Sequence, residues 1–442
     1  MTENKKRNKS KNPVINSKES KSLKDFIKKV FMHALVEEEM SEERFDEVIN
    51  DKNFFLEIFS PWHKGNKGGD LIEDFIKHID NQNINKDFSW LNILNVDKRW
   101  KKFLEKKPEW NKLEDKNKYL NMRYQIPTHF HGDIDEAVIF HCMENPRGYL
   151  GSYGDNQIDS GLGKVNLIEY YKKTYKLLNS DNNAQKNIKN IQRILTKFSK
   201  DSDIYDVREI IQDRYQLDDV NEENIENIIY NDKKSVLRYE FDRLFLPGKF
   251  DFCNKENKKK KELLKDYYYL KEYYSQLIQT NKKLDFKKLQ NKKNEIKDIA
   301  DKICNLEIYP FSCAQPALGI DGIGKNILLH SDLSRLGVYI ILRRIYIYLN
   351  SKSEKEKPAF VFRKYIGAWE ELIKTIFDEI GCEDFNKNII KELENNFFYC
   401  QLQPIGGGIT DGNILSVPNY KKFIYLKKVA FEKVSTLLPR ID

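Results

Sequence analysis

Disulfide chemistry and membrane-spanning segments are both missing from this 442-residue sequence. Its six cysteines are scattered, no two of them form a C-x-x-C pair, and no apolar secretory segment follows Met1. Both absences favour free, mostly buried thiols in a reducing cytoplasm. The longest apolar run, 336–349, is interrupted by Arg343 and Arg344, so it is too short and too charged to span a bilayer. We therefore expect a cytoplasmic protein without a membrane partner.

Net charge is scarce outside the first residues of the chain. Residues 1–24 hold eight Lys or Arg and two Glu, a net charge of +6, whereas the remaining 418 residues carry only +2. A flexible cationic arm attracts phosphate non-specifically, and the alternative is a plain solubilising terminus. The charge of the body alone does not identify a nucleic-acid-binding protein.

The residues that are abundant predict a folded chain of several parts. Hydrophobic residues make up 40% and aromatic residues 12%, which is enough for a substantial core. We predict a disordered basic tail over 1–22, a helical N-terminal region over 23–122, an α/β domain formed by 123–159 and 300–442, and a helical insertion over 160–299. The tyrosine cluster 267–274 in the insertion is interpreted as a helix-packing surface.

Local patterns predict several of the helices. Leu23, Phe26, Ile27 and Val30 follow helical spacing, and Ser41 before two glutamates is typical of a helix start. In the C-terminal half, apolar spacing predicts helices over 333–349, from Trp369 to near Gly381, and over about 420–437.

Four short apolar runs predict the strands, at 137–143, 305–309, 359–362 and 397–402. Continuous apolar runs suit strands that are buried on both faces, as in parallel sheets. Helices between the later strands imply right-handed crossovers and a parallel arrangement. Ligands bind at the carboxyl ends of such strands, so the loops that follow them are the candidate site.

These loops contain amides, cations, aromatic rings and glycines. Arg147, Arg363 and Lys364 could contact phosphate, and Lys325 borders the same region. Candidate rings for stacking on a base are Tyr149, Tyr309, Phe311 and Tyr365. The run Gly406, Gly407, Gly408 exposes backbone N–H groups that suit an anion. The alternative is that all of these are ordinary strand-terminating turns.

Four of the loop motifs together resemble the uracil-DNA glycosylase superfamily. They are Asn145-Pro146 after the first strand, Tyr309-Pro310-Phe311 after the second, Lys364-Tyr365 before Trp369 after the third, and Gln403-Pro404 after the fourth. The resemblance covers about residues 130–150 and 300–440. Met143 and Arg147 stand where the family has glycines, and Gln403 and Ile405 stand where it commonly has His and Ser.

The resemblance implies a four-stranded parallel sheet flanked by helices and a partner that is a nucleic acid, DNA first, or a nucleotide. It implies hydrolysis of an N-glycosidic bond after the base has flipped out of its stack. Asn145 would place the water, Tyr149 or Phe311 would stack the base, and Gln403 with Gly406 to Gly408 would stabilise the leaving group. A role in phage defence fits the Lys- and Asn-rich composition. The other hypothesis is a non-catalytic sensor that keeps only recognition.

Two carboxyl groups near the strand ends are candidates for acid–base chemistry. Glu144 follows the first strand directly, and Glu307 lies within the second. Glu307 either points toward solvent or pairs with Arg363.

Two further motifs are near misses. The stretch 319–326 resembles the phosphate-binding loop of NTPases, with Lys325 at the lysine position and Asn326 in place of the Ser or Thr, so a P-loop-like NTPase is a lesser alternative. His129, His131, Asp133 and Asp135 resemble a metallohydrolase cluster that would need His141 or His330 as well. We interpret the first as a glycine-rich loop and the second as an exposed approach with a turn at Gly132-Asp133. We predict no metal ion and no other cofactor.

Overall fold

The computed structural model describes residues 17–64, 67–81, 88–110, 126–145, 208, 211–212, 217–230, 233–245, 269–278, 286–311, 318–319, 321–351, 356–381, 383–403, 407–439 and 441. Residues 1–16 of the predicted disordered tail lie outside these residues. So do three candidate site residues, Arg147, Tyr149 and Gly406. The prediction of a disordered tail is wrong for residues 17–22, which belong to the helix α1 (Ser17–Glu37).

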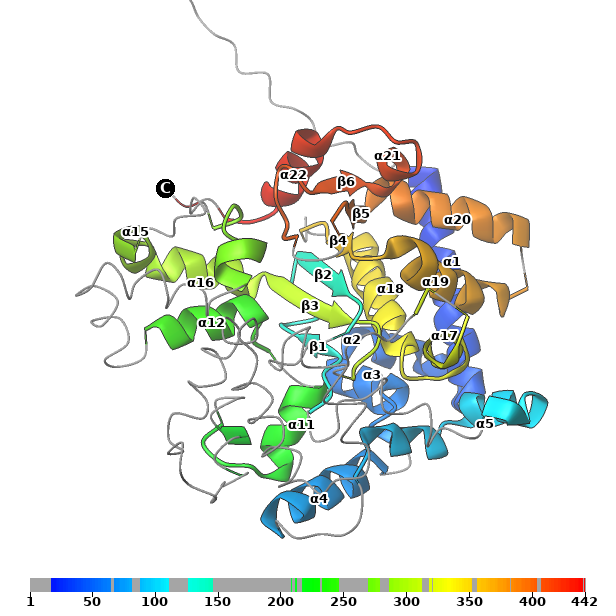
Figure 1. Ribbon diagram of the computed structural model, residues 1–442. Helices are drawn as coiled ribbons and strands as arrows, with labels where there is room; N and C mark the ends of the chain where they lie inside the picture. The colour runs from blue at the N-terminus through cyan, green and yellow to red at the C-terminus, as the bar shows by residue number, and fades with distance from the viewer. Residues whose placement is uncertain are drawn as a thin grey trace, which may run out of the picture.

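One six-stranded sheet organises the molecule, in the order β1-β3-β2-β4-β5-β6 (Figure 1). Its four central strands are β3 (Ile303–Glu307), β2 (Ile139–Met143), β4 (Ala359–Phe362) and β5 (Phe398–Gln401). All neighbours among these four are parallel, which confirms the predicted parallel core. The protein is therefore an α/β protein, mostly helical.

The prediction of a purely parallel, four-stranded sheet is wrong at both edges. β1 (Phe130–His131) pairs antiparallel with β3, and β6 (Ile414–Ser416) pairs antiparallel with β5. Strands of two and three residues are too short to show a periodic pattern in the sequence.

Two local predictions near these strands are also wrong. The second strand spans 303–307 rather than 305–309, although the backbone N–H groups of Ile308 and Tyr309 still donate to the carbonyls of Met143 and Glu144. The predicted exposed approach at 129–131 is instead interior: His129 is buried against Trp62, with ring centroids 6.1 Å apart, and the next two residues form β1.

One face of the sheet is apolar, with Phe140, Cys142, Leu306, Phe360 and Phe362 pointing into the larger core. α18 (Arg335–Asn350) covers this face, together with α1 (Ser17–Glu37), α19 (Glu370–Asp378) and α20 (Glu383–Asn396). These helices lie on the right of the sheet in Figure 1. α18 confirms the predicted apolar helix, and Gly381, with φ of 82°, follows α19 near the predicted end.

The described residues of the N-terminal region are helical, as predicted. After α1 come η1 (Glu42–Arg44), α2 (Phe45–Asn50), α3 (Lys52–Phe59), α4 (Lys67–Asp80), η3 (Trp90–Asn95), α5 (Lys98–Lys106) and η4 (Pro108–Trp110). Ser41 caps η1 by accepting a hydrogen bond from the N–H of Glu43, which confirms the helix start at this position.

Helices of the insertion and the C-terminus lie against the other face. The set comprises α12 (Val236–Leu244), the π-helical turn η7 (Tyr269–Tyr273), α15 (Phe286–Asn291), α16 (Lys293–Asp301) and α22 (Lys427–Ser435). α11 (Glu222–Tyr230) lies near β1, and α17 (Ile323–His330) precedes α18. None of the described helices combines the length and apolar character that a membrane crossing requires.

The predicted C-terminal helix over 420–437 is wrong, because it is two helices. α21 (Val417–Lys421) ends where the N–H groups of Lys422 and Phe423 bond back to Pro418 and Tyr420. Phe423 then takes a left-handed conformation with φ of 57°, which an α-helix cannot contain, and α22 begins at Lys427.

Candidate functional site at the carboxyl ends of the parallel strands

The direction of the chain reverses beside β2. From β2 the chain moves to β3 on one side, and from β3 it crosses to β4 on the other side. The first connection contains α12 and α16, and the second contains α17 and α18, so the two crossovers cover opposite faces. In open parallel sheets, ligands bind at the carboxyl edge where the strand order reverses, here between β2 and β4.

Charged side chains meet at this position, which we call the carboxyl edge. Glu144 and Asn145 follow β2, and Arg363 and Lys364 follow β4. The Lys364 ammonium lies 2.7 Å from the Glu144 carboxylate. Glu144 is half-buried, whereas Lys364 is exposed and takes a left-handed backbone conformation with φ of 48°. The edge thus joins an acidic and a basic group that remain within reach of solvent.

Below the carboxyl edge, one face of the sheet carries a buried polar layer. Its members are His141 of β2, Asn305 and Glu307 of β3, Gln401 of β5 and Arg363 after β4. The strand register places His141 opposite Asn305 and Met143 opposite Glu307. Alternate residues share a face of a strand, so these polar groups point away from the apolar core.

Tyrosines from the helical insertion cover the polar layer. The Tyr274 hydroxyl accepts a hydrogen bond from the Asn305 amide at 2.6 Å and lies 2.8 Å from Nδ1 of His141. The Arg363 guanidinium donates to the Tyr273 hydroxyl at 3.0 Å. The described part of the cluster interpreted as a packing surface, 269–274, is packed, and the hydroxyl groups of Tyr273 and Tyr274 also bind the polar layer.

The environment of Glu307 favours the uncharged acid. The side chain is buried, and among the described residues its Oε2 atom has no hydrogen-bond partner. Burial raises the pKa of Glu307 well above its ordinary range, and Glu144 adds to the rise while Arg363 opposes it. Of the two alternatives for this residue, exposure to solvent is therefore wrong, and pairing with Arg363 stays a prediction.

The imidazole of His141 is also uncharged at neutral pH. Burial lowers its pKa to about 3, Arg363 lowers it further, and the Gln401 amide opposes the change. Burial also raises the pKa of Tyr269 and Tyr274 well above the ordinary value for a phenol, so the tyrosines stay protonated. The polar layer thus holds neutral groups around one buried arginine.

The loop after β5 packs on the tyrosine-bearing turn. The Gln403 side chain is exposed. The backbone N–H of Gln403 donates a hydrogen bond to the side-chain oxygen of Asn413 at 2.9 Å. The carbonyl of Gly407 accepts a hydrogen bond from Gln401 at 3.0 Å. A Cβ atom on Gly408 would lie 2.3 Å from the Cα of Tyr273, so only glycine fits this approach. The described glycines therefore shape the loop around η7.

The two aromatic candidates after β3 lie in the core. Tyr309 and Phe311 are both fully buried, and their ring centroids are 5.2 Å apart. Phe311 also contacts Trp62, with centroids 6.4 Å apart. Both rings pack among apolar side chains, and their role in base stacking stays a prediction.

The near-miss motifs have structural partners. Lys325 lies in the first turn of α17 and pairs with Asp321 at 3.4 Å and Glu371 at 3.0 Å. β3 ends at Glu307, well before α17 begins at Ile323, so β3 does not lead directly into this loop. Among the residues that the structure describes, no three His, Cys, Asp or Glu side chains are grouped as a metal ion requires.

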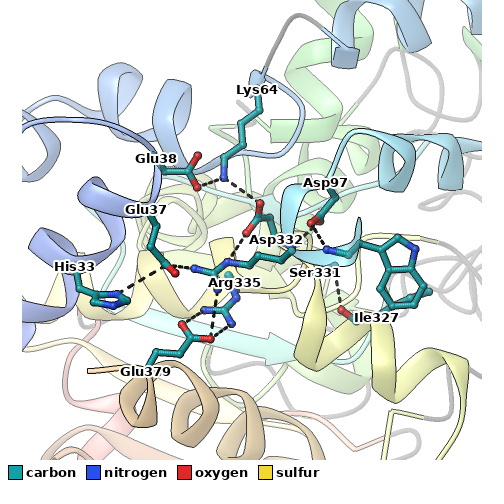
Figure 2. A network of polar contacts seen from close by, with 12 residues as sticks. His33, Glu37, Glu38, Lys64, Asp97, Ile327, Ser331, Asp332, Arg335 and Glu379 are labelled. Atoms are coloured by element: carbon teal, nitrogen blue, oxygen red, sulfur yellow. Dashed lines mark hydrogen bonds and ion pairs between the residues drawn. The ribbon is translucent and has the colours of Figure 1, made fainter. Parts of the chain in front are cut away.

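A second polar cluster lies between the N-terminal helices and the start of α18 (Figure 2). Lys64 contacts Glu38 and lies 3.2 Å from Asp332. Arg335 binds Glu379 through two hydrogen bonds, of 2.8 Å and 2.5 Å. These contacts connect elements from both ends of the chain, which indicates a structural role.

Sequence reasoning missed the polar layer although a signal was present. His141, Asn305 and Gln401 are polar residues in largely apolar strands, where each needs a buried partner. Tyr274 is the partner of His141, which lies 133 residues earlier, and of Asn305, whereas Gln401 donates to the carbonyl of Gly407 in the loop after its own strand. No local pattern could identify the contacts with Tyr274.

Protein-family models, curated proteins and solved structures were all compared with the chain, and none of them matches.

Proposed function

We propose that this protein binds a nucleotide or nucleic acid at the carboxyl edge and hydrolyses an N-glycosidic bond there, as the resemblance to uracil-DNA glycosylases suggests. The single observation that supports the proposal best is the pair of carboxyl groups, Glu144 and Glu307, in contrasting environments beside Arg363 and Lys364. Neighbouring titratable groups with different protonation states are typical of acid–base sites.

The charges favour an anionic ligand. The raised pKa of Glu307 favours its uncharged form, so this carboxyl adds little negative charge beside the Arg363 guanidinium at the edge. Lys364 is exposed and forms an ion pair with Glu144, a partner that a phosphate group could replace. Cations at the carboxyl ends of parallel strands suit phosphate or a departing base that carries negative charge.

In the proposed reaction a water molecule attacks the anomeric carbon of the nucleotide. Asn145 positions the water, and the Glu144 carboxylate accepts its proton. The bond between the sugar and the base nitrogen breaks, and its electron pair leaves with the base. Arg363 and Lys364 stabilise the negative charge that develops on the base or on the neighbouring phosphate.

The test is incubation of the protein with single- and double-stranded DNA that contains modified bases, and with free nucleotides, followed by mass spectrometry of released base. Glu144→Gln and Asn145→Ala should each lower the rate of release at least about 100-fold while binding is retained. Glu105→Gln and Asn53→Ala, at exposed positions on α5 and α3, are the matched controls and should change neither. Release that is unaffected by both edge variants would place the chemistry elsewhere.

A second candidate, a non-catalytic sensor for the same ligands, is favoured by the state of His141. This histidine is neutral at physiological pH and hydrogen-bonded beneath tyrosines, so it cannot serve as a charged acid. A sensor would bind nucleotide or nucleic acid without releasing base from any substrate, and Lys364→Ala would weaken that binding.

A further inference from the structure

The segment that separates α21 from α22 presents apolar side chains to solvent. Phe423 is 76% exposed, Tyr425 61%, Leu426 51% and Ile424 42%, and Val429 on the first turn of α22 is 45% exposed. They account for five of the seven large hydrophobic residues that are exposed in the described part of the chain. We call residues 421–429 the basic apolar loop.

Backbone hydrogen bonds hold the loop in this outward conformation. The N–H of Ile424 donates to the carbonyl of Asn419 at 2.9 Å, and that of Leu426 donates to Ile424 at 3.0 Å. Phe423 adopts a left-handed φ of 57°, which is unfavourable for a bulky side chain. At the base of the loop, Lys421 pairs with Glu370 at 2.9 Å and Glu394 at 2.7 Å. The apolar residues are thus presented by an ordered turn.

All charged residues in the sequence of the loop are basic. Four lysines, Lys421, Lys422, Lys427 and Lys428, flank the four consecutive apolar residues, and no Asp or Glu occurs from 412 to 431. Lys421 is neutralised by its acidic partners, whereas Lys422 and Lys428 are exposed. A surface complementary to this loop must combine negative charge with an apolar interior.

We propose that the basic apolar loop docks on an anionic lipid bilayer, with Phe423 to Leu426 in the interfacial region and the lysines at the headgroups. Interfacial contacts combine apolar and aromatic insertion with lysine attraction to anionic lipid. Binding of a second copy through a two-fold axis is disfavoured because it would bring the lysines of both copies together. Single-stranded nucleic acid would use the two rings but not Ile424, Leu426 or Val429.

This contact differs from a membrane span. The sequence predicts no membrane partner because it contains no segment that could cross a bilayer. A peripheral contact needs only an exposed apolar tip and flanking charge, and both become visible once the predicted helix over 420–437 is seen to be broken.

The test is co-sedimentation of the full chain with vesicles of phosphatidylcholine containing about 30% phosphatidylglycerol, chosen as a representative anionic composition. The wild-type protein should bind these vesicles and bind pure phosphatidylcholine at least about tenfold more weakly. Replacing Phe423→Asn together with Tyr425→Ser should weaken binding to the anionic vesicles about tenfold or more, because apolar area is no longer buried. Asn tolerates the left-handed conformation, so the fold should be retained.

The matched control is Val36→Ser, which removes an apolar residue that is 55% exposed on α1, outside the loop. It should leave vesicle binding unchanged. A Phe423→Trp variant adds a direct readout: brominated lipids should quench the fluorescence of the introduced indole beyond that of the native tryptophans.

Three outcomes overturn the proposal. The first is that the wild-type protein does not bind anionic vesicles. The second is that the Phe423→Asn, Tyr425→Ser double variant binds them as tightly as the wild type. The third is that brominated lipids cause no additional quenching in Phe423→Trp. Equal binding by the double variant would assign the attraction to the basic N-terminal segment alone. Binding of a single-stranded oligonucleotide that depends on the loop, without vesicle binding, would identify the loop as a nucleic-acid contact instead.

Discussion

At the scale of single residues, Tyr274 holds the polar layer together. Its hydroxyl contacts both the Asn305 amide and Nδ1 of His141, and all three side chains are buried. A buried polar group that loses its partner costs more than an average hydrogen bond contributes, because it does not regain contact with water.

Tyr274→Phe should therefore lower the free energy of unfolding by about 1–3 kcal/mol, although the aromatic ring is kept. Chemical denaturation followed by circular dichroism measures this change. The matched control is Tyr425→Phe, which removes the same hydroxyl from an exposed ring and should change stability by less than about 0.5 kcal/mol. Equal effects of the two substitutions would mean that the Tyr274 hydroxyl contributes nothing specific.

At the scale of elements, the start of α4 depends on one close approach. A Cβ atom on Gly68 would lie 1.9 Å from the backbone oxygen of Trp62, whereas a Cβ on the adjacent Gly69 would meet nothing within 4 Å. Trp62 is buried against Trp90, with ring centroids 5.8 Å apart. The first glycine thus lets α4 reach this aromatic cluster, and the second has no such constraint.

Alanine substitutions at the two positions should change the free energy of unfolding in opposite directions. Gly69→Ala should raise the free energy of unfolding by up to about 0.5–1 kcal/mol, because alanine favours the helix and restricts the unfolded chain. Gly68→Ala should lower it by about 1–3 kcal/mol, because backbone atoms must move apart. Thermal and chemical denaturation of the two single variants would detect the difference, and a stabilising Gly68→Ala would show that this approach is not tight.

The parallel strands were the elements most accessible to prediction. Each is an apolar run that is buried on both faces, so its hydrophobic pattern is strong even in isolation. The edge strands β1 and β6 owe their existence to pairing with β3 and β5, which no short window of sequence contains. The break between α21 and α22 was missed because the apolar residues 423–426 continue a helical pattern while facing solvent.

At the scale of the whole molecule, the second polar cluster joins the N-terminal helices to α18 and α19 (Figure 2). Asp97 caps α5 by accepting a hydrogen bond from Trp100 at 2.8 Å, and it also accepts one from the N–H of Asp332 at 2.7 Å. Burial, with the adjacent Asp332 carboxylate, raises the pKa of Asp97 to about 7, while backbone donors and Lys64 oppose the rise.

This shift predicts how stability depends on pH. An unfolded aspartate titrates near pH 4. Between that pH and about 7 the folded protein binds the Asp97 proton more tightly than the unfolded chain, so the contribution of this group to the free energy of unfolding falls as pH rises. The contribution is complete below about pH 4 and is lost above about pH 7.

Asp97→Asn should remove this dependence. Between pH 4 and pH 7.5 the free energy of unfolding of the wild type should fall relative to that of the variant by about 2 kcal/mol or more. The variant should also lose a constant amount of stability at every pH, because the hydrogen bond to Asp332 is altered. Urea denaturation at several pH values measures it. Asp51→Asn, at the exposed cap of α3, is the control and should show no such change near neutral pH. A difference that stays constant or grows with pH would contradict the assignment to Asp97.

For the candidate site, as for the fold, some features could be predicted from the sequence and others could not. Glu144, Asn145, Arg363 and Lys364 could be identified from the sequence because each follows a recognisable strand, and strand ends of a parallel sheet meet at one edge. The raised pKa of Glu307 could not be identified, because it follows from burial and from charges on other strands.

The sequence by itself determined the class of fold, the four parallel strands and the helical N-terminal region, because hydrophobic periodicity is a local property of the chain. Only the tertiary structure decided the edge strands, the tyrosines that cover the polar layer, the protonation of its carboxyl and imidazole groups, and which apolar residues remain exposed. These features depend on contacts between segments far apart in the chain, and burial and electrostatics are set by such contacts.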